Sequence, residues 1–138
     1  MKTLIVEDDL LCQKFLQGWL RPHGECVAAV NGYEAIDAFK AALQEGHSYD
    51  LVCLDSMMPR MDGLEALMAI RRFEKTHGVN EHDHVKIVMI SAIDTSHQIQ
   101  EAFWQGCDAY LIKPIEQRKL IEELKKLDLV LSGAPEPI

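Results

Sequence analysis

Paired cysteines, positive charge and long apolar runs are all scarce in this sequence. The four cysteines form no C-x-x-C pair, which argues against a zinc site or a thioredoxin-like redox motif. Lysine and arginine number 14 against 22 aspartates and glutamates, giving a net charge of −8. Direct binding to nucleic acid or to an anionic membrane surface is therefore disfavoured. No apolar run approaches the length of a membrane span.

What is present fits one folded domain. A chain of 138 residues with 48% hydrophobic and 26% charged residues has no disorder signature. Cys26 and Cys53 lie in apolar runs and are expected to pack as small hydrophobic side chains. The apolar stretch before Glu7 is too short for a signal peptide. We therefore expect a cytoplasmic protein with reduced thiols.

Short apolar runs alternate with longer amphipathic ones. The expected strands are residues 3–6, 26–30, 51–54, 86–92 and 109–112, and the expected helices are residues 9–21, 31–45, 63–77, 95–105 and 115–127. Five alternating pairs predict an α/β fold, a doubly wound parallel sheet with helices on both faces. We expect residues 1–127 to form the domain and residues 128–138 a C-terminal tail.

Two local patterns add detail to the helices. Leu11, Phe15 and Trp19 share one face of the first helix, and Asn31 with Glu34 resembles a capping box for the second.

Near the end of the fourth helix, Phe103 is expected to point inward. Two interpretations of Trp104 stay open: an exposed contact for a partner, or a side chain packed over Leu111 or the last helix.

Polar residues follow the expected strands. Because ligands bind beyond the carboxyl ends of parallel strands, these residues should meet at one edge of the sheet. They are Glu7, Asp8 and Asp9 after the first strand, Asp55 after the third, Ser91 near the end of the fourth and Lys113 after the fifth.

Carboxylates gathered at one point need a cation among them to stay ionised. Oxygen ligands without histidine or cysteine suit Mg²⁺ or Mn²⁺. A magnesium ion, the Lys113 ammonium and a hydroxyl donor suit the oxygens of a transferring phosphoryl group. An aspartate can itself be the nucleophile and form an acyl phosphate.

Four segments together resemble response-regulator receiver domains of two-component signalling. They are LIVEDD at residues 4–9, LDSMMPRMDG at 54–63, ISA at 90–92 and YLIKP at 110–114. The resemblance covers residues 2 to about 127 and is specific only when the four are taken together. It implies a flavodoxin-like fold: a five-stranded parallel sheet in the order 2-1-3-4-5 with five helices.

The resemblance implies a role for each acidic residue. Asp55 resembles the phosphoacceptor. Mg²⁺ would be held by Asp8 directly, by Glu7 through water, by Asp55 and by the backbone carbonyl of Met57. Asp9 lies outside this set, and its charge should favour the start of the following helix.

The resemblance also implies a switch. Ser91 matches the hydroxyl that binds the phosphoryl group, and Lys113 matches the lysine that pairs with Asp55 and then with the phosphate. The bond from Lys113 to Pro114 is expected to be cis. Tyr110 matches the aromatic residue that changes rotamer on activation.

The implied function is phosphorelay signal transduction. A histidine kinase or histidine phosphotransfer protein would pass its phosphoryl group to Asp55, and the face formed by the fourth helix, fifth strand and fifth helix would bind an unidentified protein partner. Such a protein, a monomer or a phosphorylation-dependent dimer, is not an enzyme beyond catalysing its own phosphorylation and dephosphorylation. Because Met57 and Ile93 are apolar and cannot orient a water, the phosphoaspartate is expected to be long-lived.

Rival functions lack their motifs. A haloacid-dehalogenase-type phosphatase needs a second aspartate where Met57 stands. A flavin binder needs a serine-, threonine- or glycine-rich loop where the acidic residues 7–9 stand. A stand-alone regulator and a piece of a longer protein both stay open.

Overall fold

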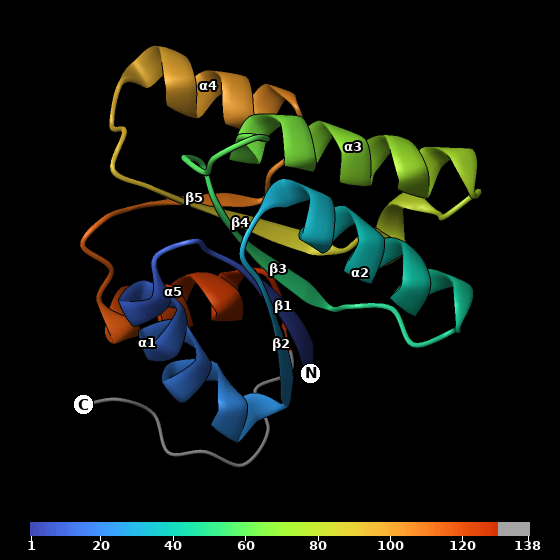
Figure 1. Cartoon of the computed structure of the whole chain (residues 1–138), viewed down its shortest axis with the longest axis horizontal. Helices are drawn as coiled ribbons and strands as arrows, with labels where there is room; N and C mark the ends of the chain where they lie inside the picture. The colour runs from blue at the N-terminus through green and yellow to red at the C-terminus, as the bar shows by residue number, and fades with distance from the viewer. Residues whose placement is uncertain (130–138) are drawn as a thin grey trace.

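The computed structural model describes residues 1–129, which form a parallel sheet covered by helices (Figure 1). Its five strands have the predicted spatial order, β2-β1-β3-β4-β5. They are β1 (Lys2–Val6), β2 (Glu25–Ala29), β3 (Leu51–Asp55), β4 (Lys86–Ser91) and β5 (Ala109–Ile112). Every neighbouring pair is parallel, so all five carboxyl ends lie at one edge.

Five α-helices connect or follow the strands. Helices α1 and α5 cover one face of the sheet, and α2, α3 and α4 cover the other (Figure 1). They are α1 (Leu10–Leu20), α2 (Gly32–Gln44), α3 (Gly63–Thr76), α4 (Ser96–Trp104) and α5 (Gln117–Lys126). Short 3₁₀ turns lie at Arg21–His23 and Glu81–Asp83. Most of the predicted tail, residues 130–138, lies outside the described residues.

The central strand β3 is buried along its whole length, as its apolar run predicts. Successive side chains of a strand point to opposite faces, so one strand supplies both cores. Val52 and Leu54 pack in the core beneath α2 and α3, and Cys53 packs in the core beneath α1 and α5. A strand held on both faces gives Asp55, its last residue, a rigid support.

The helix starts are fixed by side-chain caps. Asp9 caps α1 by accepting the backbone N–H of Leu11 at 2.9 Å. Asn31 caps α2 through the N–H of Glu34, but the Glu34 carboxylate accepts the N–H of Val30. The capping box predicted there is therefore shifted by one residue. A complete capping box, formed by Asp62 and Glu65, begins α3.

Two aromatic residues near the end of α4 are exposed. The inward position belongs to Ala102, whereas Phe103 is 46% exposed, so the prediction for Phe103 is wrong. Trp104 is 85% exposed, so the packed interpretation is wrong, and its contact with a partner stays a prediction.

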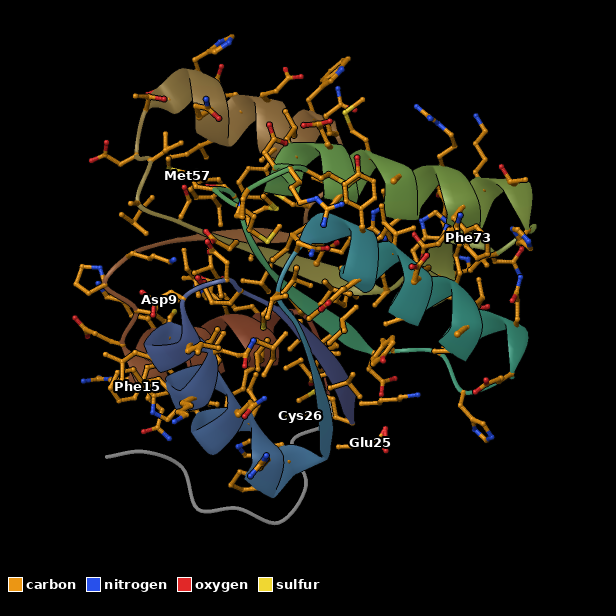
Figure 2. The ribbon with its side chains drawn as sticks, in the orientation of Figure 1. Asp9, Phe15, Glu25, Cys26, Met57 and Phe73 are labelled. Carbon is orange, nitrogen blue, oxygen red and sulfur yellow. The ribbon has the colours of Figure 1, made fainter. Side chains whose placement is uncertain are left out.

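Helix α1 carries two apolar faces. Leu16 and Leu20 form the buried one. The predicted face is the other: Leu11 and Phe15 are more than half exposed, and Figure 2 shows Phe15 at the surface of the helix. Phe15 stacks on Trp19 with ring centroids 5.9 Å apart.

The four cysteines are free, with Cys53 buried and Cys26 partly buried, as predicted. Within residues 1–129, every helix is too short or too polar to cross a membrane.

Gly63 lets α3 begin directly against the end of β3. A Cβ atom at this position would lie 2.2 Å from the backbone oxygen of Asp55 and 2.7 Å from the Cα atom of Ser56. We therefore predict that Gly63→Ala lowers the free energy of unfolding by about 1–3 kcal/mol, because backbone atoms must shift to make room. Gly18→Ala is the matched control: its Cβ would meet nothing within 4 Å, so it should raise stability by about 0.5–1 kcal/mol. Urea unfolding measures both, and equal effects would contradict this interpretation.

Candidate functional site

Three carboxylates meet at the carboxyl edge of the sheet. Glu7 and Asp8 follow β1, and Asp55 ends β3. One oxygen from each can be chosen so that all three lie within 4.8 Å of one another. Glu7 and Asp55 are buried and Asp8 is exposed, so the cluster opens to solvent on one side. Asp9 lies outside the cluster, because its carboxylate caps α1.

Lys113, the first residue after β5, supplies positive charge to this cluster. Its Nζ lies 3.1 Å from Oε2 of Glu7 and 3.5 Å from Oδ1 of Asp55. The peptide bond from Lys113 to Pro114 is cis, as predicted. The structure therefore brings together four predicted residues from three different strand ends.

Burial and a like charge act together on Asp55. Desolvation raises the pKa of its carboxyl group, the nearby Glu7 charge raises it further, and the Met57 N–H and the Lys113 ammonium lower it, with a result of about 7. Burial alone would lower the pKa of Lys113, but the hydrogen bond to Glu7 and the charges of Asp55 and Glu7 leave it raised. The lysine therefore stays charged, while Asp55 is only partly ionised near neutral pH.

The donor set fits a hard divalent cation. Its members are carboxylate oxygens, the ligands that Mg²⁺ prefers. Oε1 of Glu7 accepts the N–H of Asp9 at 3.1 Å, and the buried Oε2 faces the Lys113 ammonium at 3.1 Å. The Asp8 carboxylate lies on the exposed side of the cluster, where a metal ion or a water bound to one can reach it. The exposed Met57 follows at the rim, and its N–H donates to Oδ1 of Asp55 at 3.2 Å (Figure 2).

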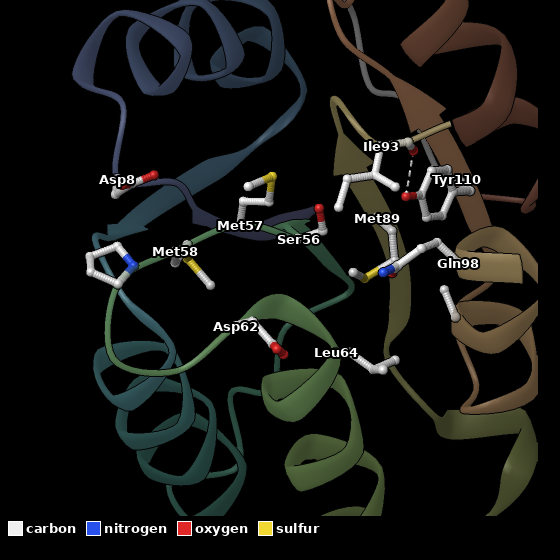
Figure 3. A pocket seen from close by; sticks show the side chains of 12 residues that line it. Asp8, Ser56, Met57, Met58, Asp62, Leu64, Met89, Ile93, Gln98 and Tyr110 are labelled. Atoms are coloured by element: carbon white, nitrogen blue, oxygen red, sulfur yellow. Dashed lines mark hydrogen bonds between the residues drawn. The ribbon is translucent and has the colours of Figure 1, made fainter. Parts of the chain in front are cut away.

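Ser91 and Tyr110 lie beside the cluster and contact the same residue, Ile93. The buried Ser91 Oγ accepts the N–H of Ile93 at 2.9 Å, and the Tyr110 hydroxyl donates to the carbonyl of Ile93 at 2.8 Å (Figure 3). Among the hydrogen bonds of residues 1–129, none joins Ser91 to Asp55. A single peptide segment thus connects the hydroxyl and the aromatic ring that were predicted to act as a switch.

A cavity of about 520 Å³ lies between the loop after β3, the loop after β4 and α4 (Figure 3). Met57, Ile93 and Tyr110 line it together with Ser56, which sequence reasoning missed. The Ser56 hydroxyl donates a hydrogen bond to Oγ of Ser91. The only signal for this contact in the sequence is a hydroxyl residue directly after Asp55.

Comparison with known proteins agrees with this geometry. Residues 3–125 match the family model of the response regulator receiver domain. Chemotaxis protein CheY of Treponema pallidum is 31% identical over 125 residues, which cover 89% of this chain and 79% of that protein. Probable histidine kinase 2 of Oryza sativa is 35% identical over 132 residues, which cover 88% of this chain, but the chain spans only 12% of that kinase.

Solved structures show the same fold. A chain of the CheX-CheY-BeF₃-Mg²⁺ complex from Borrelia burgdorferi has a TM-score of 0.79 and 26% identity, covering 94% of this chain and 90% of that one. A chain from the co-crystal of the Saccharomyces cerevisiae phosphotransfer protein Ypd1 with the receiver domain of Ssk1 has a TM-score of 0.79 and 28% identity, covering 96% and 93%.

This chain belongs to the response regulator receiver domain family, and it is a receiver domain of two-component or phosphorelay signalling.

The raised pKa of Asp55 has a consequence for stability. Without metal, the folded protein keeps a proton on Asp55 up to about pH 7, whereas the unfolded chain releases it near pH 4. The stabilisation from this proton is complete below pH 4 and is lost as pH rises through 7. We predict that Asp55→Asn, which cannot lose a proton, becomes more stable relative to wild type between pH 5 and 8, by on the order of 1–2 kcal/mol.

Chemical denaturation in EDTA measures this difference. Added Mg²⁺ should reverse the trend above pH 7, since the cation favours the ionised Asp55. A difference that stays constant with pH in EDTA would contradict the assigned environment of Asp55.

Proposed function

We propose that the protein is a phosphorylation switch in which Asp55 accepts a phosphoryl group from a phosphohistidine. The placement of Asp55 between the acidic residues Glu7 and Asp8 and the Lys113 ammonium supports this proposal most strongly. The role assigned to each residue and the domain bounds, residues 1–127, are part of the proposal. So is a cytoplasmic location, which four free cysteines favour.

Mg²⁺ fits this site. Asp8, Asp55 and the backbone carbonyl of Met57 would hold the ion, with Glu7 acting through a bound water. When bound, Mg²⁺ supplies charge neutralisation for the carboxylates and for the phosphoryl oxygens. The metal also favours the ionised form of Asp55, and a carboxylate is the form that can act as nucleophile.

The transfer step requires a nucleophile, charge neutralisation and a hydrogen-bond donor. A carboxylate oxygen of Asp55 forms the new O–P bond as the N–P bond to the donor histidine breaks, and the imidazole keeps that electron pair. Lys113 turns from the carboxylate toward the negative charge on the phosphoryl oxygens. Ser91 supplies a hydroxyl donor whose proton can point toward a phosphoryl oxygen on Asp55. The products are an acyl phosphate on Asp55 and an unphosphorylated histidine.

The switch would pass through Ile93. Its N–H is bonded to Ser91 and its carbonyl to Tyr110, so a movement of Ser91 toward the phosphoryl group displaces the support of the tyrosine ring. The face formed by α4, β5 and α5 would change with it and present itself to a protein partner. The exposed Phe103 and Trp104 on α4 are candidate contacts for that partner.

The exposed face of α1 suits the phosphodonor. Leu11, Phe15 and Trp19 line an apolar groove of about 430 Å³, and Lys113 and Ile115 line it as well. A histidine kinase or phosphotransfer protein resting there would have its histidine beside Asp55. The yeast neighbour that was crystallised with Ypd1 supports a donor of this kind.

Phosphorylation can be tested without a protein donor, because the site carries its own catalytic groups. Incubated with Mg²⁺ and acetyl phosphate, the wild-type chain should gain one phosphoryl group by intact-mass spectrometry. Asp55→Asn should gain none, since the amide that replaces the carboxylate is not a nucleophile. Equal phosphorylation of the two proteins would show that Asp55 is not the acceptor.

The phosphoaspartate should be long-lived. Met57 is exposed at the rim and Ile93 lines the cavity, and neither side chain can hydrogen-bond an attacking water. We predict that Met57→Asn speeds loss of the phosphoryl group about fivefold, the effect of one added hydrogen bond in the transition state. Met57→Leu is the matched apolar control and should leave the decay unchanged. Release of inorganic phosphate over time measures the decay of the phosphoaspartate. An unchanged rate in Met57→Asn would show that the apolar side chain at this position does not set the lifetime.

A further inference from the structure

Ser56, the residue directly after Asp55, has no part in the proposed function as stated so far. We propose that Ser56 is a positioning residue whose hydroxyl presents the Ser91 hydroxyl as a hydrogen-bond donor for the phosphoryl group on Asp55. This inference rests on the proposed function and adds one residue to the same site.

The hydrogen bonds of Ser91 carry the argument. A serine hydroxyl has one proton to donate and two lone pairs that accept. In Ser91 one lone pair accepts the hydroxyl of Ser56, and the other accepts the N–H of Ile93 at 2.9 Å. Ser91 is fully buried, so no bulk water competes for these positions. The Ser91 hydroxyl proton is therefore left to donate a hydrogen bond, and a phosphoryl oxygen on Asp55 can accept it.

The backbone of Ser56 is held at both of its polar groups. Its N–H donates to the carbonyl of Ile90 at 3.1 Å, and its carbonyl accepts the N–H of Gly63 at 3.0 Å. Asp55 pairs with Ile90 in the sheet, which places Ser56, the first residue after β3, alongside Ser91, the last residue of β4. The contact between the two hydroxyls is therefore fixed by strand register.

A further hydrogen bond links this pair of hydroxyls to β5. The Ile93 segment that donates to Ser91 also accepts the Tyr110 hydroxyl at 2.8 Å (Figure 3). The hydrogen bonds therefore run from Ser56 after β3, through Ser91 and Ile93, to Tyr110 on β5. The Ser56 side chain is partly buried on the wall of the cavity, where an added methyl group has room. Threonine can replace it with its hydroxyl kept, whereas alanine removes only the hydroxyl.

The rate of phosphorylation by acetyl phosphate with Mg²⁺ tests the proposal in the full chain. Ser56→Ala should react about fivefold more slowly, the effect of one lost hydrogen bond. Ser56→Thr should restore most of the wild-type rate. Ser48→Ala removes an exposed hydroxyl far from the site along the chain and is expected to react like wild type.

A double-mutant cycle shows whether Ser56 acts through Ser91. In the Ser91→Ala background, Ser56→Ala should have no further effect, because the hydroxyl that it positions is already gone. A fivefold loss that persists in that background, or a wild-type rate in Ser56→Ala, would overturn the proposal. Failure of the wild-type chain to be phosphorylated would instead refute the proposed function, and this inference with it.

Discussion

The contact of Lys113 with Glu7 and Asp55 is the interaction on which the site depends. Two buried carboxylates close together repel each other when both are ionised, and in the metal-free protein the Lys113 ammonium offsets part of that repulsion. It does so only because β5 runs parallel to β1 and β3 and ends at the same edge of the sheet. The chemistry of the site therefore depends on the strand order, because a different order would leave the carboxylates without the Lys113 ammonium.

In this domain the strands fix the position of Asp55, and the loop after β4 connects Ser91 to Tyr110. β3 is buried on both faces, so Asp55 is fixed by packing, while Ser91 and Tyr110 are joined through the backbone of Ile93 in the loop after β4. A group added to Asp55 can thus be sensed by a hydroxyl without moving the core. This arrangement suits a switch, because few contacts have to break for the signal to reach β5.

Much of this architecture could be predicted from the sequence. Apolar runs locate the strands within about two residues, and the polar residue that ends each run supplies the site, so Glu7, Asp55 and Lys113 converge as expected. Periodicity could not tell which of two apolar stripes on α1 is buried, and Phe15 lies on the exposed one. The contact of Ser56 depends on the register of β3 against β4, which no short-range pattern specifies.

If Glu7, Asp8 and Asp55 form one magnesium site that prepares Asp55 for phosphorylation, the wild-type chain should bind a single Mg²⁺ ion. Calorimetric titration of Mg²⁺ into the wild-type chain, Asp8→Asn and Asp9→Asn measures this. We expect affinity at least about tenfold weaker in Asp8→Asn and unchanged affinity in Asp9→Asn, where asparagine still caps α1. Equal Mg²⁺ affinity in all three proteins would show that these carboxylates do not form a magnesium site.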